Sequence, residues 1–113
     1  MSVQITQLFE PVLITDTAAT IYTVPTSPAT LVLFRGRVRF TNTDTATRSV
    51  TVYAVPKGGT AATTNIVANG ESIAPNDHLD LDIPVLAAGG FIQALTDSSG
   101  KVSASALDGL LFS

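Results

Sequence analysis

The chain has 113 residues, a formal net charge of −3 and no cysteine. The negative balance argues against a nucleic-acid partner, because such binding relies on surplus Lys and Arg, and the lack of cysteine excludes disulfides and thiolate metal sites. Charged residues form only 13% of the chain and hydrophobic residues 45%, so small neutral polar side chains must cover much of the surface, a composition typical of β-sandwiches in assemblies.

Residues 1–20 contain short apolar runs that are interrupted by a proline and an aspartate. They predict an edge strand or an arm that lies on a neighbouring subunit, with Ile5, Leu8 and Phe9 as candidate contact residues. The start of the chain lacks the basic residues and the apolar run of a secretory signal, and no segment reaches the roughly 20 apolar residues of a membrane-crossing helix. We therefore expect synthesis in the cytoplasm and no membrane partner.

Residues 21–113 predict a single all-β domain. A period of two, with many β-branched and aromatic residues, recurs in five segments: 30–43, 48–56, 77–85, 90–96 and 101–109. Clusters of turn residues such as PKGGTA, ANGES and DSSG separate them. Strands at this spacing predict an antiparallel β-sandwich, immunoglobulin-like or jelly-roll-like, with about seven to nine strands and little or no helix.

The alternation also predicts which side chains face the core. In segment 30–43 the inward set is Val32, Phe34, Val38 and Phe40, and Gly36 on the same side indicates a bulge or bend, or a close approach by another backbone. The inward residues of the other four segments are Val50, Val52, Ala54, Leu79, Leu81, Ile83, Val102, Ala104 and Ala106, together with either Ile92 and Ala94 or Phe91 and Leu95.

Two segments carry charged residues at alternate positions on their predicted outer faces. The arginine stripe consists of Arg35, Arg37 and Arg39, and the acidic stripe of His78, Asp80 and Asp82. An immunoglobulin-like strand order would pair the two segments and place the stripes opposite each other. The simpler interpretation is a charged ladder within one chain, which contributes little when exposed. The alternative is that one stripe meets the other across a subunit boundary, which makes all six residues a candidate interface.

Residues for chemistry are few. His78 is the only histidine, and no serine lies in a nucleophile elbow. Paired carboxylates for hydrolysis need a cleft that a short-looped sandwich lacks. A metal site at Asp77, His78, Asp80 and Asp82 lacks the glycine-containing loop of a calcium site, and Asp77 would face the opposite side of the strand. We predict no catalytic residue, no cofactor and no metal.

Two long stretches carry a family resemblance. Residues 21–61 read IYTVPTSPATLVLFRGRVRFTNTDTATRSVTVYAVPKGGTA, and residues 72–109 read SIAPNDHLDLDIPVLAAGGFIQALTDSSGKVSASALDG. The YTVP opening, the strand that ends in TN, the VTVY.VP.GG hairpin edge and the later I.P and L.AG motifs resemble small β-sandwich structural proteins of tailed bacteriophages. The motifs are short and turn-dominated, and no catalytic or binding residue comes with them.

The resemblance implies a virion component, with a capsid decoration (cement) protein as the leading expectation and a head-tail or tail accessory domain beside it. Its partners would be the major capsid protein or other virion proteins and copies of itself, with a trimer as the first expectation. The alternatives are a tail or fibre-associated adhesion module that binds a host surface, and a small hydrolase that depends on His78.

Overall fold

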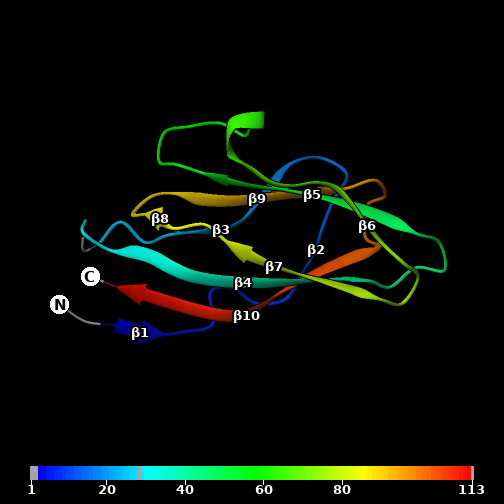
Figure 1. Ribbon diagram of the computed structural model, residues 1–113, viewed down its shortest axis with the longest axis horizontal. Helices are drawn as coiled ribbons and strands as arrows, with labels where there is room; N and C mark the ends of the chain where they lie inside the picture. Colours follow the sequence, from blue (N-terminus) through cyan, green and yellow to red (C-terminus); the bar gives the residue numbers. More distant parts are fainter. Residues whose placement is uncertain (1–2, 28, 113) are drawn as a thin grey trace.

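The computed structural model describes residues 3–27 and 29–112, which form two stacked antiparallel sheets (Figure 1). The larger sheet has the order β1 (Val3–Ile5), β10 (Val102–Phe112), β4 (Val32–Asn42), β7 (His78–Ile83), with β2 (Val12–Leu13) also on β10 and β8 (Leu86–Ala87) on β4. The smaller sheet has the order β3 (Ala19–Thr23), β9 (Phe91–Thr96), β5 (Arg48–Val55), β6 (Ile66–Ile73). The predicted all-β sandwich is confirmed, with ten strands in the described residues, three of them no longer than three residues.

Two bulges interrupt the long central pair of β4 and β10. The register passes over Leu107 of β10 and Phe34 of β4, so each strand holds one residue that has no partner across the ladder. Both inserted side chains are exposed, Phe34 to 42% and Leu107 to 40%. Beyond its bulge β4 turns Leu33 inward instead, so the prediction that Phe34 and Val32 face the core is wrong. Val32 is half-buried and lies on the outer face of the sheet. The alternation itself holds, but it slips by one residue at the bulge.

The core lies between the two sheets and contains most of the predicted residues. Buried as predicted are Val38, Phe40, Val50, Val52, Ala54, Ile83, Ile92, Ala94, Val102 and Ala104. The three remaining inward positions of β7 and β10, Leu79, Leu81 and Ala106, are half-buried and pack against this cluster. The β9 alternative with Phe91 and Leu95 is wrong. Missed by the alternation are Leu8, Ile14, Val24, Leu31, Leu33, Val55, Ala68, Ile73, Leu86 and Leu111.

A fully buried amide fixes the end of β4. The Nδ2 of Asn42 donates hydrogen bonds to the carbonyl oxygens of Ala46 and Ile73, each at 2.9 Å. Its Oδ1 accepts a hydrogen bond from the backbone N–H of Asp44, also at 2.9 Å. The side chain thereby joins the β4–β5 turn to the end of β6, which satisfies polar backbone groups that would be costly to bury alone.

The segment before β3 lies along β10 of its own chain. β1 and β2 both pair with β10, and the Thr6 N–H donates to the Gly109 carbonyl at 2.8 Å. Gly109 is required there, because a Cβ atom would collide with the Thr6 carbonyl oxygen and lie 2.6 Å from Leu8 Cδ2. Leu8 and Ile14 are buried, so the segment completes one side of the core.

The region 60–73 contains a predicted turn that the structure does not have. A single 3-10 turn, η1 (Thr63–Asn65), leads into β6. It is the one helical element in the described residues, where no helix is long and apolar enough to cross a membrane. The ANGES cluster lies inside β6, where Gly70 adopts a φ of 62° and its N–H donates to Thr51 Oγ1. A glycine with positive φ serves bulges as well as turns, which is why the turn prediction was wrong.

Candidate interaction surface

The outer face of the larger sheet is built from rows of side chains that cross the strands. Residues directly opposite each other in an antiparallel pair lie on the same face, so the registers define five rows. From one end to the other they are Val3–Phe112–Val32, Ile5–Leu110–Arg35, Asp108–Arg37–Asp82, Ser105–Arg39–Asp80 and Leu13–Ser103–Thr41–His78. The face therefore changes from apolar through charged to mostly neutral polar along the strands.

The two charged rows form ion pairs within the chain. Arg39 holds Asp80 with two hydrogen bonds, Nε to Oδ1 at 2.7 Å and Nη2 to Oδ2 at 3.0 Å. In the next row Arg37 Nε lies 3.6 Å from Asp82 Oδ1. The predicted pairing of β4 with β7 is confirmed, and for these arginines the ladder within one chain is what the structure contains.

The Arg39 pair is the stronger of the two because of its fork geometry. The hydrogen bonds from Arg39 lower the pKa of Asp80 below its ordinary value, and Asp80 in turn raises the pKa of Arg39. Because Arg37 and Arg39 are paired with Asp82 and Asp80, these four side chains present little net charge to a binding partner. We therefore regard them as part of the sheet's own structure.

A second ion-pair cluster, which was not predicted from the sequence, lies just beyond the Asn42 end of β4. Arg48 Nε donates to Asp44 Oδ2 at 2.9 Å, and Arg48 Nη1 lies 3.8 Å from Asp97 Oδ2. The hydrogen bond from Arg48, helped by that from the Thr45 N–H, lowers the pKa of Asp44. The cluster connects the β4–β5 turn to the turn after β9. No periodic pattern marks it, because Asp44 and Asp97 come from turns and only Arg48 lies on a strand, as the first residue of β5.

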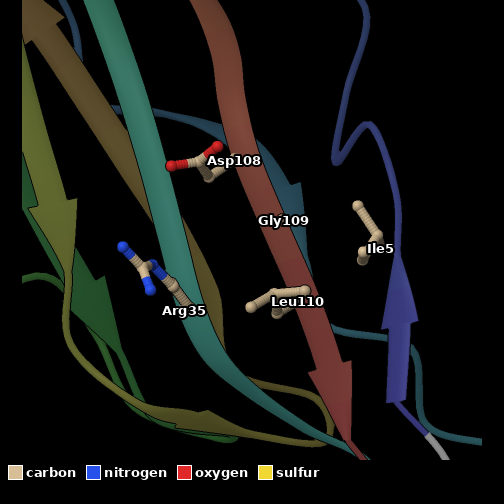
Figure 2. A pocket seen from close by; sticks show the side chains of 5 residues that line it. All are labelled: Ile5, Arg35, Asp108, Gly109 and Leu110. Atoms are coloured by element: carbon tan, nitrogen blue, oxygen red, sulfur yellow. The ribbon is translucent and has the colours of Figure 1, made fainter.

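Arg35 differs from the other two arginines. It lies opposite Leu110 rather than opposite an aspartate, and in the described part of the chain neither Arg35 nor nearby Asp108 has an ion pair. Both line an open hollow of about 250 Å³ together with Ile5, Gly109 and Leu110. Figure 2 shows Ile5 on the β1 side of β10 and Arg35 on β4 at the other side, with Asp108 and Leu110 between them.

Next to this hollow is an apolar area that the sequence did not predict. Val3, Val32, Phe34 and Phe112 line a hollow of about 380 Å³, and Val3 is 53% exposed. The rings of Phe34 and Phe112 pack edge to face, with centroids 6.0 Å apart at an interplanar angle of 86°. Contiguous apolar patches on a protein surface often mark interaction sites. The patch was missed because Phe34 was predicted to face the core.

The remaining predicted site residues lie apart from one another. Leu8 is buried in this chain's own core and Phe9 packs against it, whereas Ile5 is 87% exposed. His78 is exposed at the far end of β7, where its Nδ1 lies 3.7 Å from Asp77 Oδ1. Within the described ranges its ring has no hydrogen bond to a hydroxyl group, and no three His, Asp or Glu side chains gather as a metal site would require.

Comparisons with known proteins support the fold. No model of a known protein family matches this chain, and no curated protein is significantly similar to it. Two crystal structures from infectious bursal disease virus are similar: the VP2 subviral particle, with a TM-score of 0.52, 13% identity and 97% of this chain covered, and the T13 viral particle, with a TM-score of 0.53, 14% identity and 97% covered. The chain spans 32% and 30% of the lengths of those chains.

At these identities the likeness concerns the fold alone. Both structures belong to infectious bursal disease virus and not to a tailed bacteriophage. They therefore agree with the β-sandwich that the phage resemblance implied, while the phage context itself rests on the sequence motifs.

Proposed function

We propose that this chain is a structural component of a virus particle and acts through protein–protein contacts. The observation that carries the proposal is the outer face of the larger sheet, where an apolar patch lies beside Arg35 and Asp108, neither of which has an ion pair within the described residues. Such a surface suits binding to another protein surface. The similarity in fold to protein of a viral particle adds support.

Within that class, the phage-like motifs of residues 21–109 favour a capsid decoration protein. Its partners are then the major capsid protein or another virion protein, and it is made in the host cytoplasm and ends in the virion. A protein that binds only the assembled lattice stabilises that lattice by mass action. This role needs a surface of constant shape and no catalytic activity. It fits a sandwich in which the two longest strands, β4 and β10, stay paired along their length despite two bulges.

The test is to locate the chain on purified particles. Virus particles are purified from cells in which the chain is produced and are examined by immunogold electron microscopy with an antibody against the chain. The gold should label the shell. Label at the tail tips would instead favour the adhesion module. Particles without label, with the chain left in the unassembled fraction, would contradict a structural role in the virion.

The hydrolase alternative has its own test. His78→Ala should leave both the thermal melting curve and particle binding unchanged, because the ring is exposed and is paired only loosely with Asp77. A hydrolytic activity of the wild-type chain that this substitution abolished would replace the structural proposal with an enzymatic one.

A further inference from the structure

We propose that a second copy of this chain docks on the hollow lined by Ile5, Arg35, Asp108, Gly109 and Leu110, and that the two copies meet face to face around a two-fold axis. This deepens the proposed function and rests on it for the expectation that the chain works by assembling. The occupant is a second copy because the surface carries both halves of each contact that it needs.

The charges of the hollow are complementary to themselves. Arg35 and Asp108 are diagonal neighbours, one row and one strand apart, and have no ion pair in the described part of the chain. Consider a two-fold axis that lies in the contact plane and crosses the line between Arg35 and Asp108 at its midpoint and at a right angle. Rotation about this axis places each Arg35 over the partner's Asp108, so the contact forms twice per dimer. The Arg–Asp pairs that are missing within one chain would thus form between two, where charge matching selects the partner.

The apolar contacts fall in the same place. With strands about 4.8 Å apart and residues about 3.4 Å apart along them, Ile5 and Leu110 lie within about 2 Å of that axis. The two copies of Ile5, which is 87% exposed in the single chain, would therefore meet at the centre of the contact. Arg37 also lies near the axis, where its pairing with Asp82 reduces repulsion between the copies.

The sheet edges offer less to a second copy. β1 is only three residues long, and β6 is bent by the Gly70 bulge. β7 carries Asp80 and Asp82 and is followed by Pro84. β3, the other edge of the smaller sheet, is five residues long and its register with β9 passes over Ile21. Short, bulged and charged edges of this kind resist the addition of another strand, so the outer face is the better surface for self-association.

The experiment measures mass in solution by sedimentation equilibrium over a range of concentrations. The wild-type chain should approach twice its 11.7 kDa as concentration rises. Arg35→Asp leaves two acidic groups at the contact and Asp108→Arg two basic ones, so each variant alone should stay monomeric. Mixed in equal amounts they should form a hetero-pair with one ion pair reversed and the other as in the wild type, which native mass spectrometry identifies from the masses of the two chains.

Matched controls separate this effect from a general change of charge. Lys57→Asp and Glu71→Arg make the same charge changes at exposed positions on and beside the smaller sheet, and both should dimerise like the wild type. Ile5→Asp should remove the dimer and keep the melting temperature of the monomer, because the side chain is exposed.

Four outcomes would overturn the inference. They are a wild-type chain that is monomeric at all concentrations, a wild-type trimer, single variants that still dimerise, or a mixture that does not pair. A monomer that nevertheless labels the shell would reject the two-fold contact alone. A dimer that labels no particle would reject the virion role alone, so the two proposals fail separately.

Discussion

The outer face of the larger sheet has two regions with different balances of charge. In the rows of Arg37 and Arg39, each guanidinium group has an aspartate directly across on β7. In the row of Arg35 and at Phe34, β7 has ended, and the neighbours are aliphatic or aromatic. The first region satisfies its charges within the chain. The exception is Asp108, which lies in the row of Arg37 but has no ion pair in the described residues. Together with Arg35 and the apolar side chains of the second region, it is left for another surface.

The difference originates in the two bulges. Leu107 and Phe34 are the residues that the ladder passes over; both are exposed, and Phe34 lines the apolar hollow. Bulges redirect side chains near functional sites in many sheets. Here they turn apolar side chains to the surface that a regular alternation would have directed elsewhere.

The largest expected effect on stability comes from replacing each of the two phenylalanines of β4 by alanine in separate variants. Phe40→Ala should lower the free energy of unfolding by about 3–5 kcal/mol, because the ring is fully buried. Phe34→Ala should lower it by about 0.5–1.5 kcal/mol, the value of an aromatic pair at a partly exposed site. Urea denaturation of both variants measures the difference. Equal losses would mean that Phe34 belongs to the core after all.

The second prediction concerns Gly109, which lines the hollow and lies against the N-terminal segment. Gly109→Ala should lower the free energy of unfolding by about 1–3 kcal/mol, because the new methyl group overlaps Thr6 and Leu8 and pushes the segment away from β10. Amide hydrogen exchange should show faster exchange at Thr6, whose N–H bonds to Gly109. Gly100→Ala is the control for the exchange rate: its φ of 78° makes the substitution cost stability too, but a Cβ there meets nothing within 4 Å, so exchange at Thr6 should stay as in the wild type. An unchanged exchange rate at Thr6 would contradict the close approach.

How far the sequence could predict this molecule depends on the kind of signal. Alternation predicted β4, β5, β7, β9 and β10, most of the core and the pairing of the stripes, because period-two burial is a local property. It did not identify β6, where a turn was predicted instead. It failed at Phe34, since a bulge depends on the partner strand, and at Leu8, whose burial depends on Gly109 far along the chain. The hollow of Arg35 and Asp108 brings together residues from three strands, so no local pattern indicated it.

The arginines provide the third prediction. Arg39→Ala should lower the melting temperature more than Arg37→Ala, because the Arg39 pair has two short hydrogen bonds and the Arg37 pair a single contact at 3.6 Å. Arg35→Ala should change the melting temperature least and weaken self-association most. Differential scanning fluorimetry and sedimentation equilibrium measure the two effects. A variant of Arg39 that lost association while Arg35→Ala kept it would reverse the assignment of the two regions.

The smallest effect is the pH dependence of the neutralised region. The pKa values of Asp80 and Asp44 are lowered by hydrogen bonds from Arg39 and Arg48, respectively. A carboxyl group whose pKa is lower in the folded state contributes stability above its unfolded pKa, here about 3.8, and loses that contribution as the pH falls through the folded value. The advantage in melting temperature of the wild type over Asp80→Asn should therefore be constant near pH 6 and shrink below about pH 4. An advantage that grew on acidification would mean that the pair with Arg39 does not favour the charged carboxylate, and the contrast between the two regions would lose its electrostatic basis.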